Sequence, residues 1–388
     1  MKPLRIVLVM PQAPLPFGGA AARWHYVLLR GLVARGHRVT AFASCGAEDV
    51  EACRSLFDAD HGLRLFRREP LSGLRPRLAA MGRPGSYLFS PAFRESLARD
   101  LLSGVDVLHL EELWSGWVGI GAKCRTVLNI HSLYALDLRT PGARSLTAWR
   151  LAHAERRILR RYSTLTALTP RLTEQVRRVN PSARVTTVPL GLALDSYTFV
   201  PPFRRACPTV GLIGSFSWAP TFSAAIRLMD CLWPSIRRQV PNAKLQLVGR
   251  EANRLLAGRA AVSDVSVHDT VPDIVPFFRD LDVLVYAPTD ASGVKIKVLE
   301  AMAFGVPVVS NAEGIEGIPA EDGVHLGLAE DDAGLVERTV RLLLDVGERT
   351  RLASAARRLV EERCSEEIAL DATEAHYRTQ MAPDRLPV

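Results

Sequence analysis

Short apolar segments alternate with helical segments from one end of the chain to the other, and this alternation constrains the fold more than any other feature. The apolar segments are continuous runs of Val, Ile and Leu, which is typical of parallel strands buried on both faces. In the first half, the predicted strands are 5–10, 38–44, 63–68, 105–110, 126–130, 164–169 and 184–190. In the second half, they are 209–214, 243–249, 265–269, 281–287, 306–310 and 324–328. The pattern predicts two doubly wound α/β domains.

The length of the chain also indicates two domains, because 388 residues are too many for one ordinary core. We expect an N-terminal domain over 1–200 and a C-terminal domain over 201–370. The connecting segment is irregular and rich in proline, which places a boundary and a hinge near Pro201 or Pro202. The last helices have no strand after them, so we expect 370–388 to pack on existing surface, with the N-terminal domain as one candidate.

The composition argues against several classes of protein. Apolar residues make up 48% and charged residues 23%, as in globular proteins that fold throughout. The apolar runs are too short to cross a bilayer, and the N-terminal run is too short for a signal peptide and ends in prolines. The six cysteines form no C-x-x-C pair, so we predict neither a zinc site nor a disulfide framework, and a reducing cytoplasm fits best.

Arginine accounts for most of the net charge of +8 and is densest over residues 144–163. This segment predicts an amphipathic helix with Trp149, Ala152, Ile158 and Leu159 on or near one side. Its arginines lie mostly on the other sides: Arg150, Arg156, Arg157, Arg160 and Arg161. The helix is interpreted either as a solvated surface or as a peripheral contact with an anionic membrane or acidic acceptor. No recognition motif accompanies it, so no nucleic-acid partner is predicted.

Both halves open with a strand, a glycine-containing loop and a helix. Gly18 and Gly19 form the first loop, and Gly214 and Ser215 form the second. Backbone N–H groups at a helix N-terminus attract phosphate, and glycine allows a ligand to approach closely. Tight turns also use glycine for structural reasons, so the two loops together are stronger evidence than either alone. We expect them to face each other across the hinge.

Two motifs are considered and set aside. A dinucleotide fingerprint would need a third glycine after Gly119 and Gly121, where Cys124 stands. The triplets at 58–60 and 280–282 could hold a divalent metal through paired aspartates. The second triplet lies between a predicted helix end and a buried strand, so we interpret it as capping and solubility and predict no metal site.

Five stretches together resemble the GT-B-fold glycosyltransferases, in particular the large retaining group called family 4. They are the Gly18-Gly19 loop, "NIHS" at 129–132, "GSFSWAP" at 214–220, "VGR" at 248–250 and "SGVKIKVLEAMAFGVPVVS" at 292–310. The resemblance covers nearly the whole chain. It implies two Rossmann-like domains facing across a cleft, with a nucleotide sugar held mainly by the C-terminal domain and the acceptor by the N-terminal domain.

The last stretch is the most specific. Ser292, Gly293 and Val294 precede a helix whose free N–H groups can bind a diphosphate, and Lys297 adds positive charge. The resemblance implies that Glu300 grips the ribose hydroxyls. Lys297 and Glu300 share a helix face, so the alternative is an ordinary surface ion pair. Neither residue is expected to belong to the core.

The chain departs from the family pattern at two places. The family has a second glutamate eight residues before the ribose-binding one, and Ser292 stands there. The nearest replacement in the sequence is Asp290. Basic residues that the family often carries after the first strand of the second domain are also missing, so Lys297 is expected to neutralise the phosphates, with Lys295 or Arg250 in reserve.

His131 matches the N-domain histidine that approaches the reacting sugar in the family. It follows a strand directly, where open α/β sheets place ligand-contacting groups, although a structural role is the alternative. Glu111 and Glu112 end the preceding predicted strand and could orient an acceptor hydroxyl.

These observations predict a metal-independent glycosyltransferase without a cofactor, and His131, Lys297 and Glu300 are the predicted catalytic residues. The donor is expected to be a UDP-sugar before a GDP- or dTDP-sugar, and the acceptor a hydroxyl of a cell-envelope glycan, a lipid-linked glycan or a natural product. The resemblance alone implies retention of configuration. The alternatives are a sugar-nucleotide 2-epimerase of the same fold and a catalytically inactive sugar-nucleotide-binding protein.

Overall fold

The computed structural model describes residues 2–57, 61–69, 80–137, 146–256, 258 and 264–381. The chain forms two compact units. The first takes in Met1–Ala135, Pro141–Leu192 and Glu366–Val388, and the second takes in Leu136–Thr140 and Ala193–Ser365. The chain therefore returns to the first unit at Glu366.

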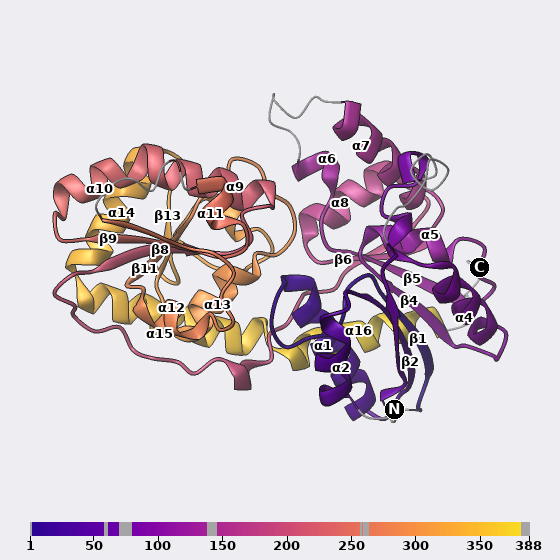
Figure 1. Cartoon of the computed structure of the whole chain (residues 1–388). Helices are drawn as coiled ribbons and strands as arrows, with labels where there is room; N and C mark the ends of the chain where they lie inside the picture. The colour runs from indigo at the N-terminus through magenta and orange to yellow at the C-terminus, as the bar shows by residue number, and fades with distance from the viewer. Residues whose placement is uncertain are drawn as a thin grey trace, which may run out of the picture. The chain divides into compact units, whose positions relative to one another are not determined.

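The first unit is built on a seven-stranded sheet with the order β3-β2-β1-β4-β5-β6-β7, in which every pair is parallel (Figure 1). Its strands are β1 Arg5–Met10, β2 Arg38–Cys45, β3 Leu63–Arg67, β4 Val107–Glu111, β5 Arg125–Ile130, β6 Thr164–Ala167 and β7 Arg184–Thr187. The direction of winding changes between β1 and β4. Ligands of open α/β sheets bind beyond the carboxyl ends of the strands at such a point.

The helices of the first unit connect these strands, apart from α16, which returns to this unit after the second one. They are α1 Ala20–Ala34, α2 Asp49–Leu56, α4 Pro91–Leu101, α5 Gly116–Gly119, α7 Leu146–Leu159, α8 Pro170–Val179 and α16 Glu366–Met381, and α6 Tyr134–Asp137 enters the second unit at Leu136. The starts of α4 and α8 follow from the sequence, because each helix has a capping hydroxyl followed by a proline at its first position. The Ser90 side chain accepts a hydrogen bond from Phe93 N, and the Thr169 side chain accepts one from Leu172 N.

The C-terminal helix α16 packs against α1 in the first unit. Nε2 of His37 lies 2.7 Å from Oε1 of Glu374, and Arg35 contacts Asp371 at 2.6 Å. Tyr377 is fully buried. The last helix therefore covers existing surface of the N-terminal sheet.

The second unit is built on a six-stranded parallel sheet with the order β10-β9-β8-β11-β12-β13. Its strands are β8 Thr209–Ile213, β9 Lys244–Val248, β10 Val265–His268, β11 Val283–Tyr286, β12 Val308–Ser310 and β13 Gly327–Leu328. The winding changes direction between β8 and β11, which again marks a ligand-binding edge.

The second sheet is covered by helices on both faces (Figure 1). They are α9 Ala219–Ile226, a π-helix over Arg227–Leu232, α10 Trp233–Gln239, α11 Ala252–Leu256, α12 Val275–Asp280, α13 Ile296–Phe304, α14 Asp332–Leu344 and α15 Val346–Arg363. Helix α10 contacts α14, and α13 contacts α15. Helix α13 ends at Gly305 in a left-handed conformation and leads into β12, as its sequence predicts.

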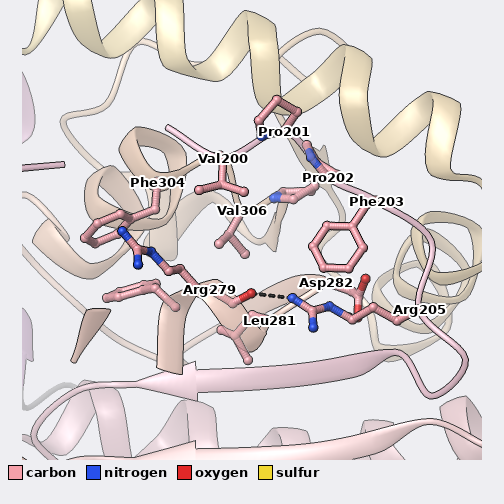
Figure 2. Close-up of a pocket in the computed structure, with 13 residues that line it drawn as sticks. Val200, Pro201, Pro202, Phe203, Arg205, Arg279, Leu281, Asp282, Phe304 and Val306 are labelled. Carbon is pink, nitrogen blue, oxygen red and sulfur yellow. Dashed lines mark hydrogen bonds and ion pairs between the residues drawn. The ribbon is translucent and has the colours of Figure 1, made fainter. Parts of the chain in front are cut away.

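The proline-rich segment that begins at Val200 packs on the second unit, where Figure 2 shows it beside a small cavity. Arg205 lies 4.3 Å from the ring of Phe203 and donates a hydrogen bond to the carbonyl of Arg279. The cavity measures about 20 Å³, which is the size of a water molecule. It is a shallow pocket beside the segment with room for about one water molecule.

The two doubly wound parallel sheets confirm the predicted fold class. Each predicted strand segment overlaps an observed strand. The triplet at 58–60 lies outside the described residues. In the other triplet, Asp280 is exposed but Asp282 is only 4% exposed, so the solubility role predicted for it is wrong. Asp282 instead lies 3.4 Å from Nη2 of the buried Arg349, because the end of α12 turns it inward.

The predicted apolar side of the basic helix is partly wrong. Trp149 is 64% exposed, and the buried side of α7 consists of Ala154, Glu155, Ile158 and Leu159. Glu155 is buried because its carboxylate accepts hydrogen bonds from the backbone N–H groups of Tyr134 and Ala135, at 2.7 Å and 3.4 Å. The hydrogen-bonded Glu155 thus lies on the buried side of the helix, where apolar periodicity alone does not place it.

Candidate active site

His131 and Glu111 form an ion pair at the carboxyl edge of the first sheet. His131 directly follows β5, and Glu111 is the last residue of the neighbouring β4. Nε2 of His131 lies 2.5 Å from Oε2 of Glu111. The Glu111 side chain has no exposed surface, whereas 14% of the His131 side chain is exposed.

Several further donors surround the Glu111 carboxylate. Trp24 Nε1 donates at 3.1 Å and Asn129 Nδ2 at 3.2 Å, and His109 Nε2 lies 2.7 Å from Oε1. Burial alone would raise the pKa of Glu111, but the charge of His131 and the hydrogen bonds from His109 and His131 hold it well below its ordinary value. The carboxylate is therefore ionised and its charge is compensated.

The pKa of His131 moves in the opposite direction. Burial would lower this pKa, but the Glu111 carboxylate, by charge and by hydrogen bond, raises it above its ordinary value. The ion pair thus favours the charged form of the ring, with Nε2 bonded to Glu111. Its other nitrogen, Nδ1, is the atom that can donate to a ligand. We interpret Glu111 as the residue that holds His131, and direct contact with an acceptor stays a prediction for Glu112.

Glu112 has a strained backbone. Its φ of 62° and ψ of 152° lie in a region that residues other than glycine rarely adopt. Gln12 Nε2 donates to its Oε1 at 3.1 Å, and 25% of its side chain is exposed. Burial raises its pKa, more than the nearby His131 lowers it. The strain places this carboxylate at the edge of the sheet, next to the His131 ion pair.

His25 belongs to the same cluster, although sequence analysis missed it. It lies on the buried face of α1, and its Nε2 is 3.9 Å from Oε2 of Glu111 and 3.8 Å from Oε1 of Glu112. Burial lowers its pKa to about 4, so the ring is neutral. His25, Glu111 and His131 could hold a cation, because their ligand atoms lie within 4.8 Å of one another. The hydrogen bonds already made by Glu111 favour the ion pair over metal ligation.

The first glycine loop precedes α1 at the same edge. Gly18 has a φ of 84°, Gly19 caps α1, and both are exposed. No acidic residue occupies the first turn of α1. Anion binding at this helix N-terminus stays a prediction.

The second glycine loop contacts Lys297 in the second unit. A Cβ on Gly214 would lie 2.7 Å from Cε of Lys297, and a Cβ on Gly249 would lie 1.8 Å from the carbonyl oxygen of Gly214. Glycine is required at position 249, where the clash is with backbone, whereas at Gly214 the clash is with the flexible end of Lys297. Nζ of Lys297 lies 4.3 Å from the centre of the Tyr286 ring. The fold thus brings together Gly214 and Lys297, which sequence analysis assigned to one ligand.

The residues around Gly214 and α13 have different degrees of exposure. Ser215 bonds Ser217 through its hydroxyl at 2.8 Å, and Arg250 is exposed on the neighbouring loop. Lys295 caps α13 and is only 4% exposed, because its Nζ donates to the carbonyl of Gly293. Of the two reserve cations, Arg250 is therefore the exposed one.

Glu300 is buried, and the expectation that it lies outside the core is wrong. It is 2% exposed, and its Oε1 accepts a hydrogen bond from the Tyr197 hydroxyl at 3.1 Å. A buried carboxylate also does not fit the alternative of an ordinary surface ion pair. The apolar face of α13 packs inward over almost the whole helix, so Glu300 is buried with it.

Asp137 is the second residue that sequence analysis missed. It ends α6, is 4% exposed, and accepts a hydrogen bond from the Ser292 hydroxyl at 2.7 Å. Asp290, the replacement carboxylate suggested by the sequence, lies two residues before Ser292 and is half-buried. No motif near Asp137 could have identified it, because its partner is 155 residues away in the chain.

Two doubly wound units, each with a glycine loop and a helix N-terminus at the carboxyl edge of its sheet, define the class of GT-B glycosyltransferases. The family described as "Glycosyl transferases group 1" matches residues 207–345, and the "Glycosyl transferase 4-like domain" matches residues 18–191. Residues 207–345 thus match a group 1 glycosyltransferase domain and residues 18–191 a glycosyltransferase 4-like domain, and the chain is a glycosyltransferase. None of its described helices combines the length and apolar character that a membrane crossing needs.

Solved structures share the fold at low sequence identity. Sucrose-phosphate synthase from Thermosynechococcus elongatus is 19% identical, with a TM-score of 0.74 over 98% of this chain and 100% of that chain. WaaG, a glycosyltransferase involved in lipopolysaccharide biosynthesis, is 17% identical, with a TM-score of 0.69 over 95% and 99%. Anabaena Alr3699/HepE in complex with UDP and glucose is 15% identical, with a TM-score of 0.68 over 97% and 100%. A comparison with curated proteins finds no match.

Proposed function

We propose that the protein transfers a sugar from a nucleoside-diphosphate sugar to a hydroxyl group without a metal ion. The observation that carries this proposal is the arrangement in the second unit, where Lys297 packs on Gly214 at the start of α13 and Glu300 lies one turn further along the helix. The cation, the helix N-terminus and the carboxylate then match a diphosphate and the ribose next to it.

The chemistry follows from this arrangement. Transfer breaks the bond between the anomeric carbon and the diphosphate, so negative charge grows on the leaving group. The N–H groups of α13 and the ammonium of Lys297 stabilise that charge in the position where a metal ion would otherwise act. The resemblance assigns His131 to the reacting sugar and supports Glu112 as the partner of the acceptor hydroxyl. The resemblance to family 4 supports retention of configuration.

UDP is the nucleotide that we propose. Structures of HepE in complex with UDP-glucose and with UDP share the fold, which supports this choice. The test is a thermal-shift screen over UDP-, GDP- and dTDP-sugars, because a ligand that binds only the folded state raises the melting temperature. If none of these ligands shifts the melting temperature, the proposal is wrong.

Activity assays then separate the alternatives. Incubation with UDP-N-acetylglucosamine alone should give no epimerised product, and an epimer would identify a 2-epimerase. Slow hydrolysis of the bound donor, or transfer to a hydroxyl acceptor, would support the transferase. Donor binding without hydrolysis or transfer across a broad panel of acceptors would indicate an inactive binding protein.

A further inference from the structure

We infer that Asp137 supplies the carboxylate of the donor-sugar subsite and accepts a hydrogen bond from a hydroxyl of the transferred sugar. The inference rests on the proposed function, because it assumes that a nucleotide sugar binds at the N-terminus of α13. It assigns a substrate contact to a residue that lies far from that helix in the sequence.

The position of Asp137 is the first observation. Oδ1 of Asp137 accepts the Ser292 hydroxyl at 2.7 Å, and both residues belong to the second unit. Ser292 opens the short loop of Gly293 and Val294 that leads to Lys295, the cap of α13. The carboxylate is therefore held beside the helix N-terminus where we place the diphosphate.

The second observation is an unused acceptor. Asp137 is 4% exposed, and its Oδ2 has no hydrogen-bond partner among the residues that the structure describes. A buried acceptor without a donor costs stability, and a ligand that brings a donor removes that cost. The protein thus keeps one oxygen of this carboxylate free at the edge of its proposed donor site.

The charge state of Asp137 is consistent with a site that binds a hydroxyl group. Burial raises the pKa of Asp137 to about 6, against the opposing effects of the Ser292 hydrogen bond and the charge of Lys295. The group is still mostly ionised at neutral pH. It is then a pure acceptor with its negative charge balanced in part by Lys295.

Among the parts of a nucleotide sugar, the transferred sugar is the one that remains to donate a hydrogen bond to Asp137. The diphosphate of a nucleotide sugar is itself an anion and an acceptor, so it cannot pair with Asp137. The ribose is the proposed partner of Glu300, and the base lies beyond the ribose. The hydroxyls of the transferred sugar, which is joined to the other end of the diphosphate, are the remaining donors.

The experiment compares a nucleotide with its sugar conjugate. Wild type and variants are titrated calorimetrically with UDP and UDP-glucose, and with GDP and GDP-mannose in parallel. Asp137→Asn and Asp137→Ala should weaken the nucleotide sugar about tenfold or more, as expected for a lost charge-assisted hydrogen bond, and leave the bare nucleotide within about twofold. Adding Ser292→Glu to Asp137→Ala should restore part of the loss, because it returns a carboxylate to the same loop.

Two controls keep the result specific. Ser292→Ala removes only the partner of Oδ1 and should have a smaller effect than Asp137→Asn. Asp290→Asn tests the carboxylate that lies nearest in the sequence, and a sugar-selective loss in that variant alone would overturn the inference. Melting curves for every variant identify any that do not fold, and the binding comparison is made on those that do.

Each remaining outcome is decisive. If the Asp137 variants bind nucleotide and nucleotide sugar like wild type, or weaken both equally, Asp137 only holds the loop and the inference is wrong while the proposed function stands. If wild type binds no nucleotide, the proposed function and this inference fail together.

Discussion

The hydroxyl of Tyr197 donates a hydrogen bond to Oε1 of Glu300 at 3.1 Å, although 103 residues separate the two in the chain. This bond gives the glutamate on α13 a structural partner on one oxygen. Its other oxygen, Oε2, is the atom that we expect to meet the ribose. Binding and stability therefore depend on the same side chain.

Substitutions at Glu300 should separate these two roles. Glu300→Ala leaves the buried Tyr197 hydroxyl without its acceptor and should lower the free energy of unfolding by about 1–3 kcal/mol. Glu300→Gln keeps an acceptor for Tyr197, so it should melt near wild type but bind nucleoside more weakly, by roughly 1.5–3 kcal/mol. Urea unfolding and calorimetric titration measure the two effects. Equal nucleoside binding by wild type and Glu300→Gln would remove Glu300 from the ribose site.

Lys297 should act on the diphosphate. Lys297→Met keeps the stem that packs against Gly214 and removes the charge, so it should weaken nucleoside diphosphate binding about tenfold or more and bare nucleoside binding hardly at all. Lys244→Met is the matched control, since Lys244 is exposed at the opposite, amino end of β9. A variant that loses diphosphate and nucleoside binding in parallel would point to a structural role instead.

Glu111 should control the charge of His131. In wild type the carboxylate raises the His131 pKa, so the ring stays charged up to a higher pH than an ordinary histidine. Glu111→Gln should lower that pKa and move the alkaline limit of transfer activity to lower pH. NMR titration of the ring protons measures the pKa directly. His131→Ala should lower kcat by about 100-fold with donor affinity within a few-fold. An unchanged pH profile in Glu111→Gln would show that activity does not depend on the imidazolium.

The same ion pair predicts how stability depends on pH. The raised pKa of His131 means that its contribution is complete below its ordinary value of 6.5 and is lost as the pH rises through the folded value. The lowered pKa of Glu111 means that its contribution is complete above its ordinary value of 4.5 and is lost as the pH falls through the folded value. The stability difference between wild type and Glu111→Gln, measured by urea unfolding, should be largest between pH 4.5 and 6.5. A difference that does not change with pH would contradict the ion pair.

Helix α7 should bind anionic membranes if the acceptor is lipid-linked. Leu146 and Trp149 are 78% and 64% exposed on this arginine-rich helix, and apolar side chains next to basic ones favour a charged lipid surface. Vesicles that contain anionic lipid should float with the protein, and salt should release it. Trp149→Ala should reduce recovery without changing the melting temperature. Equal recovery with neutral and anionic vesicles would leave only the solvated-surface interpretation.

The sequence alone determined the secondary structure and its order. Continuous apolar runs predicted the strands of both sheets, and Gly305 predicted the end of α13, because these features depend on local backbone preference and on burial along one segment. The glycine loops and His131 could also be placed at strand ends, since parallel strands direct all their carboxyl ends to one edge.

Only the tertiary structure decided which polar groups meet. The ion pair of His131 with Glu111, the bond of Tyr197 to Glu300 and the bond of Ser292 to Asp137 join different elements of the chain. Periodicity shows that a position is buried, but not which distant side chain offers it a hydrogen bond. The apolar sequence of α13 accounts for the burial of Glu300, but no local pattern contains its partner Tyr197 or the partner of Asp137, because these contacts form only when the sheets and helices pack.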